Sequence, residues 1–500
     1  MPRTKNIFLF LLTGIVFFLS VTYIADSFSQ SYQRKKSFTD KQTTQKNQPS
    51  SLRYDPQRPS GYNSRSSTLS SPWKHTSNLP LVIIDTDGKW IPNEPKTSAW
   101  MKIIYDESGS RNGLNSSHIH FEGKIGIEIR GQTSQMFPKK QYGIEIQDDT
   151  GNDKDVSLLG MPAGSDWVLN GPYTDKTLMR NYLAYEFSNR IGRYATRTRF
   201  VEVFLNTNKQ KEIQTQHYVG VYLLIEKIKR GKNRIPIQSL KPTHTKSPEI
   251  SGGYIIKIDK RDPQETYFFT RRRTEIKHVY PKGHNMPYMQ RMWIKNYMDK
   301  FESALSGPEF KDPHSGYAKY IDIDSFIDHF IINEMFKNTD GFRISAYMYK
   351  DRGGKLNMGP VWDFNLSMGN TVIHEGWRTN TWLIYTNPVP FWWHKLLTDP
   401  SFKMKLVKRW RTLRKNVISN SAILNEIDRT VEYLSEAQVR NFEKWRILPH
   451  TLFANPGPGA PTYQGQVDDV KTWLKTRLKW MDENIEKLPG RPQYVQRRRY

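Results

Sequence analysis

The spacing of apolar residues changes near residue 284, and this change constrains the possible fold more than any other feature of the chain. Before it, apolar and polar residues alternate, as in Gly126–Arg130 and Tyr142–Ile146, and this pattern predicts strands. After it, apolar residues recur with helical spacing, which predicts amphipathic helices. The chain is therefore expected to be an α+β protein, strand-rich over residues 79–283 and mostly helical over residues 284–490.

Other segments extend this pattern. Further strands are predicted at Leu79–Ile84, Phe200–Leu205, Tyr218–Glu226 and Gly253–Asp259, and one early helix is predicted at Asp175–Ile191. The later helices are expected at Tyr288–Leu305, Ile323–Phe336, Phe391–Val417, Ser421–Trp445 and Val467–Leu488. A cleft between a strand-rich lobe and a helical lobe is a common place for a nucleotide.

The amino terminus has the features of an export signal. Arg3 and Lys5 precede an apolar run from Ile7 to Ile24. The run is also close to the shortest length that crosses a bilayer, so an uncleaved membrane anchor is the alternative. Either interpretation of residues 1–30 places the rest of the chain outside the cytoplasm, secreted or anchored in the membrane by its N-terminus.

The chain is strongly basic. It has 75 Lys and Arg against 49 Asp and Glu, a net charge of +26, which attracts anions such as nucleotides, anionic lipids and acidic glycans. Polar and basic residues dominate residues 31–78, which we expect to be a disordered tether, and residues 491–500 form a basic tail. An anionic cell-surface polymer or a membrane surface is therefore a candidate partner, whereas nucleic acid is not expected because no nucleic-acid-binding motif occurs. The chain has no cysteine, which excludes disulfides, thiolate metal sites and cysteine nucleophiles.

Two acidic residues are the best candidates for chemistry. Asp340 follows a predicted helix, with Gly341 as its expected stop, and Asp363 follows a predicted hairpin that begins at Ser345. Phosphoryl transfer requires such a pair, because one carboxylate orients and deprotonates the acceptor hydroxyl while another holds Mg²⁺. The same spacing also suits two aspartates that merely cap turns, so the pattern alone leaves both interpretations open.

Several motifs in order resemble the spore-coat protein H (CotH) kinase family. They are Ile129-Arg130-Gly131-Gln132-Thr133-Ser134 with Pro138-Lys139-Lys140, Leu159-Gly160-Met161-Pro162, Asp166-Trp167-Val168-Leu169-Asn170-Gly171, Met179-Arg180-Asn181, Gly220–Lys227, Gly252-Gly253-Tyr254 and Gly359-Pro360-Val361-Trp362-Asp363-Phe364-Asn365. The resemblance spans residues 79–370. It implies an atypical two-lobed protein-kinase-like fold that uses ATP and Mg²⁺ to phosphorylate serines of exported or surface proteins.

The resemblance also implies roles for particular residues. Asp340 corresponds to the catalytic aspartate and Asp363 to the metal-binding one, with Asn365 and Ser345 as further candidate metal ligands. Ser345 and Asn365 stand where some members carry Asn and Asp, so weaker metal binding is expected here. Contacts to ATP are expected from Arg130, Lys139 and Lys140, and Glu226 is a candidate partner for a lysine or arginine.

Three functions follow from these observations. The first is an exported kinase that transfers phosphate from ATP to Ser or Thr hydroxyls of extracytoplasmic proteins. The second is a catalytically inactive surface or structural protein that keeps the fold for binding or assembly. The third is a kinase that phosphorylates a glycan.

Overall fold

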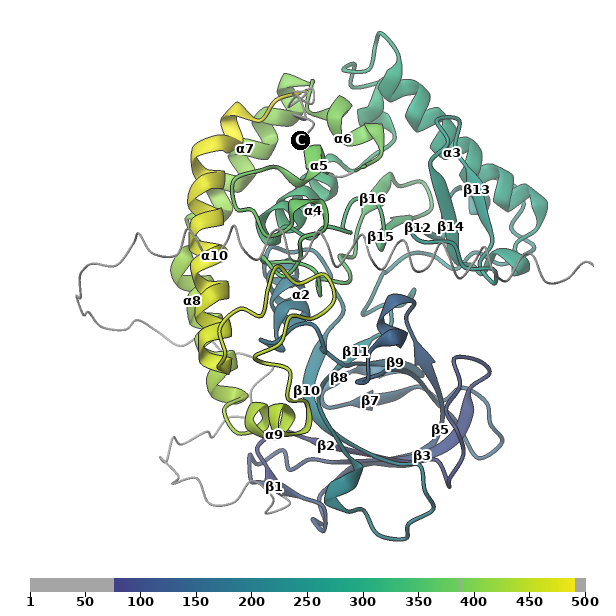
Figure 1. Ribbon diagram of the computed structural model, residues 1–500. Coiled ribbons are helices and arrows are strands. Elements are labelled where there is room, and N and C mark those ends of the chain that lie inside the picture. The colour runs from purple at the N-terminus through teal and green to yellow at the C-terminus, as the bar shows by residue number, and fades with distance from the viewer. Residues whose placement is uncertain (1–75, 387, 491–500) are drawn as a thin grey trace, which may run out of the picture.

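The computed structural model describes residues 76–386 and 388–490. The predicted export signal, most of the tether and the basic tail lie outside the described residues. Within them, no helix is both long enough and apolar enough to cross a membrane. The described chain is α+β, with strands concentrated in its first half and helices in its second (Figure 1).

The first half folds into a closed barrel. Its seven strands are β2 (Leu81–Asp85), β3 (Thr97–Ile104), β5 (Ile119–Arg130), β6 (Gln141–Ile146), β9 (Asp166–Asn170), β10 (Thr198–Asn206) and β11 (Tyr218–Glu226). Their order around the barrel is β10-β11-β9-β6-β5-β3-β2, and a parallel pairing of β2 with β10 closes it. The alternating apolar residues point inward, so that Ile125, Ile127 and Ile144 are buried in the barrel core. Short strands β1 (Thr76–Ser77), β4 (Asn112–Gly113), β7 (Val156–Leu158) and β8 (Met161–Gly164) form two small additional sheets.

A second sheet lies beside the barrel (Figure 1). It has the order β13 (Tyr267–Phe269), β14 (Glu275–Tyr280), β12 (Tyr254–Ile258), β15 (Ala346–Lys350) and β16 (Leu356–Met358). Three of these strands precede residue 284 and two follow it. The predicted boundary at 283/284 therefore runs through a continuous sheet, because hydrogen bonds between β12 and β15 join the two sides.

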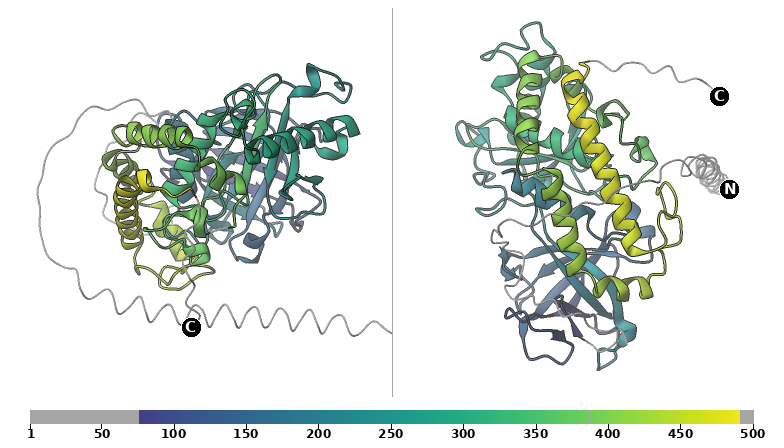
Figure 2. Two further views of the ribbon diagram at one scale, coloured as in Figure 1. Left: turned by 90° about the horizontal axis from the view of Figure 1, so that it is seen from above. Right: turned by 90° about the vertical axis from the view of Figure 1, so that its left-hand side faces the viewer.

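Helices pack around this sheet and along one side of the molecule (Figures 1 and 2). They are α2 (Arg180–Arg190), α3 (Tyr288–Ser306), α4 (Ile323–Phe336), α5 (Leu383–Thr386), α6 (Phe391–Leu396), α7 (Pro400–Arg414), α8 (Asn420–Tyr433), α9 (Ala437–Lys444) and α10 (Tyr463–Asn484). Helix α4 has the predicted bounds. The helix expected over Phe391–Val417 is instead divided into α6 and α7, because Asp399 caps a new helix by accepting a hydrogen bond from the Ser401 amide at 2.9 Å. The helix expected over Ser421–Trp445 is likewise divided into α8 and α9.

A buried ion pair fixes the end of α4. Glu334 on α4 and Arg477 on α10 lie 2.8 Å apart, and neither side chain is exposed. Glu334 also accepts hydrogen bonds from the backbone amides of Leu383 and Ile384, and Arg477 donates to the Thr381 carbonyl. The helix then ends at Lys337, which adopts a left-handed conformation with φ 49°. The expected stop at Gly341 is therefore wrong, because Lys337 ends the helix four residues earlier by turning the backbone.

A second buried cation joins the barrel to α9. The Lys139 ammonium group donates to the Val221 carbonyl at 2.6 Å and to Asn441 Oδ1 at 2.7 Å, and it lies 5.0 Å from the centre of the Tyr222 ring. Burial lowers the pKa of Lys139 well below its usual value. Lys140, the next residue, is only partly buried and donates to the Gln135 carbonyl at 2.6 Å.

These two adjacent lysines give a matched test of stability. Replacing Lys139 by Met removes a donor from two buried acceptors, so Lys139→Met is expected to lower the free energy of unfolding by about 1–3 kcal/mol. Lys140→Met is expected to change it by less than about 1 kcal/mol. Urea unfolding followed by tryptophan fluorescence measures both. Equal effects of the two substitutions would contradict this role for Lys139.

Candidate active site

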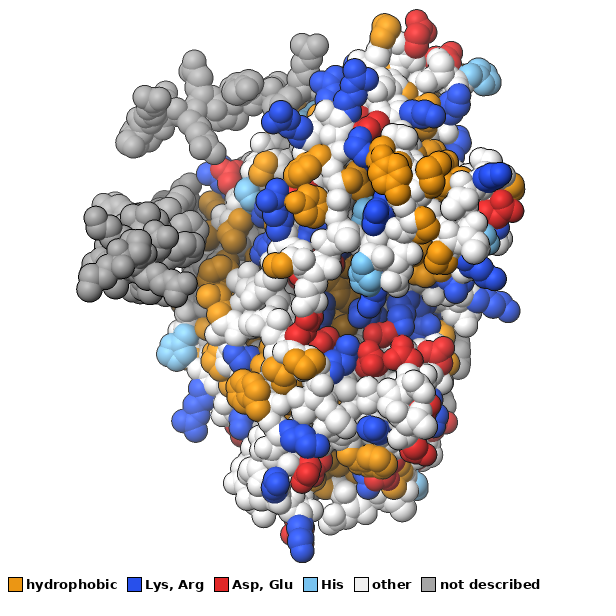
Figure 3. Space-filling model, turned by 90° about the vertical axis from the view of Figure 1, so that its right-hand side faces the viewer, with side chains coloured by type: hydrophobic (Ala, Val, Ile, Leu, Met, Phe, Trp, Pro, Cys, Tyr) orange, Lys and Arg blue, Asp and Glu red, His pale blue; other side chains and the backbone are white. Residues whose placement is uncertain are grey.

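A large polar cavity lies between the barrel and the second sheet. Its volume is about 750 Å³, and it is lined by the ends of barrel strands, the loop after β12 and the loops that carry Asp340 and Asp363. Figure 3 looks onto this side of the molecule and shows acidic and basic side chains gathered around a hollow. A cavity of this size suits a nucleotide-sized ligand.

The loop after α4 places Asp340 in the cavity. The carboxylate oxygen Oδ1 of Asp340 accepts a hydrogen bond from Arg343 Nη2 at 3.0 Å, and the Asp340 amide donates to Asn338 Oδ1 at 3.3 Å. Ser345, at the end of the same loop, also lines the cavity and has a left-handed backbone with φ 52°. Arg343 therefore orients one oxygen of Asp340.

Asp363 lies in the same cavity on a constrained backbone. Its φ is 58°, a conformation that non-glycine residues seldom adopt, and its amide donates to the Tyr185 hydroxyl at 3.1 Å. The preceding residue, Trp362, stacks on the Tyr185 ring with 5.7 Å between the ring centres. Burial, and secondly the negative charge of Asp340, raise the pKa of Asp363 to about 6, while Arg130 opposes the rise. Asp340 is therefore close enough to affect the ionisation of Asp363.

An asparagine on α2 fixes the segment that follows Asp363. Asn181 Oδ1 accepts a hydrogen bond from the Phe364 amide at 2.6 Å, and Asn181 Nδ2 donates to Asn365 Oδ1 at 2.9 Å. Because a backbone amide can only donate, this bond sets the orientation of the Asn181 side chain and, through it, that of Asn365. Asn365 consequently turns its Nδ2 toward Asp363 Oδ1, 2.5 Å away. In this arrangement Asn365 positions Asp363, and only the second lone pair of its carbonyl oxygen is left for a metal ion.

The neighbouring residue on α2, Arg180, holds the same loop from another direction. Its guanidinium donates to the Ser367 carbonyl at 3.1 Å and pairs with Asp175, and both side chains are buried. Asp175 also accepts from the Thr177 and Arg180 amides, which delays the start of the helix predicted from Asp175 until Arg180. The Met179-Arg180-Asn181 motif therefore acts as a clamp on the loop after Asp363.

The structure brings five of the eight predicted site residues together. The residues that line the cavity are Arg130, Asp340, Ser345, Asp363 and Asn365. Arg130 comes from the end of β5, and its guanidinium lies 5.8 Å from the centre of the Trp362 ring.

The other three predicted residues do not line the cavity. Lys139 is committed to the contact with α9, and Lys140 is bonded to the Gln135 carbonyl. Glu226 does pair with arginines, Arg197 at 2.9 Å and Arg234 at 3.3 Å, but this buried cluster lies outside the cavity. The structure therefore does not bring Lys139 and Lys140, the two predicted ATP contacts, to the cavity, whereas the arginine pairing predicted for Glu226 is present away from it.

The sequence interpretation missed other residues of the cavity. Asp259 and Lys260 line it, and their charges act in opposite directions on the pKa of Asp363. Asp259 is the last residue of the strand predicted at Gly253–Asp259, and Lys260 follows it. Charged residues at the end of a strand are a signal that could have identified both. Lys227 and Lys257 also line the cavity and pair there with acidic side chains, Lys227 with Asp166 at 3.3 Å and Lys257 with Glu265 at 2.7 Å.

The acidic side chains of the cavity supply some of the ligands that a divalent cation needs. Mg²⁺ usually takes one or two protein carboxylates together with phosphate oxygens and water. Asp340 and Asp363 supply two carboxylates whose mutual repulsion a cation would relieve. Within residues 76–386 and 388–490, no cluster of three or more His, Cys, Asp or Glu side chains suited to a metal occurs.

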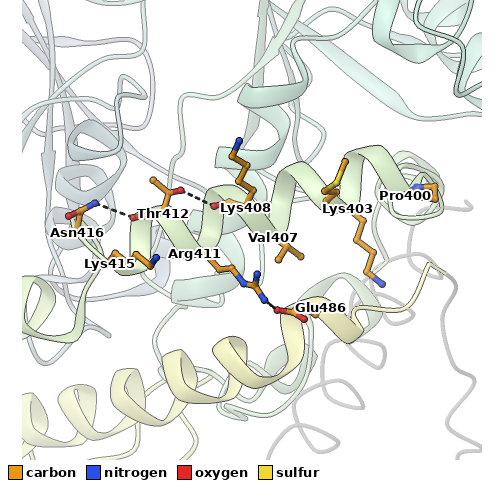
Figure 4. A pocket seen from close by; sticks show the side chains of 10 residues that line it. Pro400, Lys403, Val407, Lys408, Arg411, Thr412, Lys415, Asn416 and Glu486 are labelled. Carbon is orange, nitrogen blue, oxygen red and sulfur yellow. Dashed lines mark hydrogen bonds and ion pairs between the residues drawn. The ribbon is translucent and has the colours of Figure 1, made fainter.

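A second hollow runs along the outer face of α7 and has a different character (Figure 4). Its volume is about 630 Å³, and basic side chains of α7, among them Lys403, Lys408 and Lys415, line it. Arg411, also on this face, pairs with Glu486 (Figure 4). None of the predicted site residues lies there, so the cavity that holds Asp340 and Asp363 is the candidate active site.

Comparison with known proteins gives the family. The CotH kinase protein family matches residues 127–481, which include most of the barrel, the cavity and the helices up to α10. No curated protein matches the chain. Because the match covers well over half of the chain and includes both Asp340 and Asp363, this protein belongs to the CotH kinase family.

Proposed function

We propose that this protein is an exported kinase that transfers the terminal phosphate of ATP to Ser or Thr hydroxyls of extracytoplasmic proteins. The observation that carries the proposal is the meeting of Asp340 and Asp363 in one cavity, from loops that start on different elements. Family membership supports an atypical kinase. We further propose that the barrel and the part that contains the second sheet correspond to the two lobes of a kinase-like fold.

Each carboxylate has a distinct role in this proposal. Asp340 would accept the proton of the acceptor hydroxyl, with the oxygen that Arg343 does not contact free to face it. Asp363, held by Asn365 and by the Tyr185 hydroxyl, would bind the cation. Arg130 would contact phosphate oxygens, because its guanidinium lies at the cavity wall and its charge favours anions near Asp363.

The cation would be Mg²⁺, and ATP the phosphate donor. When bound, Mg²⁺ neutralises phosphate oxygens and stabilises the charge of the transition state. Asp363 is its main protein ligand in the proposal, with Ser345 and Asn365 as neutral oxygen donors. Lys260, which also lines the cavity, is a further candidate contact for the phosphates, whereas Lys257 pairs with Asp259 and Glu265.

Export is proposed from the apolar run at Ile7–Ile24. The excess of basic residues is compatible with attachment of the protein to an anionic cell-surface polymer or membrane. An acceptor protein in the same compartment would then be held near the enzyme.

Phosphate incorporation tests the two aspartates. Asp340→Asn and Asp363→Asn are each expected to reduce transfer from labelled ATP by about a hundredfold or more, because general-base and metal-binding groups contribute on this scale. Asp324→Asn, which changes an exposed carboxylate on α4, is the control and is expected to retain activity. Autoradiography of acceptor proteins after incubation with Mg²⁺ or Mn²⁺ gives the measurement.

The outcome also separates the alternative functions. Equal incorporation by the wild type and both aspartate variants would contradict the proposed roles. If the folded wild type transfers no phosphate to varied acceptors, the non-catalytic binding function is favoured. Label released by glycosidases instead of proteases would indicate a glycan acceptor.

The raised pKa of Asp363 predicts a dependence of stability on pH. Asp363 has a folded-state pKa of about 6, against about 4 for an unperturbed aspartate. The folded protein therefore binds more protons than the unfolded one between these values, and the free energy of unfolding falls as pH rises through them. Without metal, Asp363→Asn is expected to be more stable than wild type near pH 7.5 by about 1–2 kcal/mol, less than the full shift implies because the side chain is partly exposed.

The difference in free energy of unfolding between Asp363→Asn and the wild type should disappear near pH 4, where the carboxyl group of Asp363 in the folded wild type is protonated and therefore uncharged. Urea unfolding in EDTA at the two pH values measures it. A stabilisation by Asp363→Asn that is independent of pH would show that the charge of Asp363 is not its cause.

A further inference from the structure

One strand beside the cavity has an open edge. Strand β13 is the outermost strand of the second sheet and pairs with β14 only. Figure 1 shows the two strands beside α3, far from the helices α8 and α10. An open edge presents backbone amides and carbonyls that can pair with another extended chain.

The hydrogen bonds of the β13–β14 hairpin show which groups point outward. The Thr270 amide donates to the Thr274 carbonyl at 3.0 Å, and the His278 amide donates to the Thr266 carbonyl at 3.1 Å. In an antiparallel pair the bonded residues alternate, so Thr266 and Thr270 face β14. The amides and carbonyls of Tyr267 and Phe269 consequently point away from β14, toward the open edge.

The side chains of the same two residues are also exposed. Tyr267 is 46% exposed and Phe269 is 41% exposed, and their rings are in contact with 5.6 Å between centres. Arg261 lies over both rings, at 5.6 Å and 6.0 Å from their centres. The edge strand is short, with three residues, and Arg261 is the charged side chain beside it, but the aromatic pair on it stays exposed.

The turn of this hairpin is strongly basic. Arg271, Arg272 and Arg273 are all exposed, and none of their guanidinium groups forms an ion pair within the described part of the chain. Asp299 and Glu302 accept hydrogen bonds from the backbone amides of Arg271 and Arg272, and the Arg272 guanidinium lies 5.4 Å from the centre of the Phe391 ring. Arg273 has φ 62°, the left-handed conformation that such a hairpin turn normally assigns to glycine. Three adjacent guanidinium groups at one end of the edge favour a negatively charged partner.

The other end of the edge leads into the active-site cavity. Asp259, Asp262 and Glu265 line the cavity together with Asp340, and β13 begins two residues after Glu265. An extended chain paired with β13 would run from the arginine turn to the mouth of the cavity. The edge is therefore continuous with the proposed site of phosphate transfer.

We propose that the edge of β13 is the docking site for the acceptor polypeptide, which adds to the sheet as an extra strand. This inference rests on the proposed function, because it assigns the acceptor of that reaction. Main-chain hydrogen bonds from Tyr267 and Phe269 supply pairing, their rings contact alternate acceptor side chains, and Arg271–Arg273 bind acidic residues of the acceptor. The preferred acceptor is thus an extended, acidic segment near a Ser or Thr.

The geometry sets the distance between the acidic residues and the hydroxyl. Arg271 lies six positions after Glu265, or about 20 Å at the rise of an extended strand. The acidic cluster of the acceptor is therefore expected about six or more residues from the phosphorylated hydroxyl.

Peptide binding to the full-length protein without ATP tests the docking site. The probe is a fluorescein-labelled peptide of about twelve residues with a serine near one end and glutamates near the other. Its control is the same peptide with lysines in place of the glutamates. Fluorescence anisotropy is expected to show tighter binding of the glutamate peptide and weakening with added salt.

Two variants address the two parts of the site. Arg271→Glu with Arg273→Glu is expected to weaken binding of the glutamate peptide about tenfold or more through charge repulsion. Phe269→Pro removes an amide that points away from β14 and should weaken binding without breaking the hairpin. Lys403→Glu with Lys415→Glu on α7 is the control, since it makes the same charge change on the outer face shown in Figure 4, and it should leave the affinity unchanged.

The results separate this inference from the proposed function. Equal affinity for the two peptides, or equal losses from the hairpin and α7 substitutions, would overturn docking at β13. Phosphate transfer that persists with unchanged acceptor KM in the hairpin variant would also overturn it while leaving the kinase function intact. Peptide binding that depends on the hairpin, in a protein that transfers no phosphate, would support docking and count against the kinase function. Circular dichroism of Phe269→Pro checks that it folds, and the arginine variant decides the test if it does not.

Discussion

The side chain of Asn181 connects the barrel, helix α2 and the loop that carries Asp363. Its Oδ1 accepts the Phe364 amide, and its Nδ2 donates to Asn365 at 2.9 Å and to Asn170, at the end of β9, at 3.1 Å. Unpaired amide groups in such a buried place are costly, so these bonds are satisfied together or not at all. Asn181 thus joins the Asp363 loop to the barrel, while Tyr185 and Arg180 hold the same loop from α2, and the left-handed backbone of Asp363 persists because its neighbours are fixed on both sides.

The position of Asp340 depends on a different set of contacts. Its loop leaves α4 where Glu334 and Arg477 form a fully buried pair, so α10, close to the C-terminal end of the described chain, holds the start of the loop. Removing one member of such a pair leaves an uncompensated buried charge. The two carboxylates therefore meet in one cavity because two separate hydrogen-bonded networks, one on α2 and one on α10, place their loops. Burial of Asp363, and secondly the charge of Asp340 brought beside it, raise the pKa of Asp363.

Much of the secondary structure was predictable from local patterns. Strand β11 and helix α4 have the predicted bounds, because alternation and helical spacing both reflect burial on one face. Predictions were less accurate where a local side chain changed the backbone, as where Asp399 begins α7 and where Lys337 ends α4. The boundary at residue 284 marked a real change in periodicity, but strands from both sides of it pair in the second sheet. Sequence spacing says nothing about pairing between strands that are some ninety residues apart.

The sequence by itself determined the α+β class, the ordered motifs of the CotH kinase family and two candidate aspartates, Asp340 and Asp363. The tertiary structure decided which charged residues surround those aspartates. Lys139 and Arg130 are both cations at strand ends, yet one bonds to Asn441 on α9 and the other lines the cavity. Which of the two residues lines the cavity depends on contacts with residues far away in the chain. The positions of those residues are fixed only when the barrel, the second sheet and the helices pack together. For the same reason, the open edge of β13 became visible only once the strand order of the sheet was known.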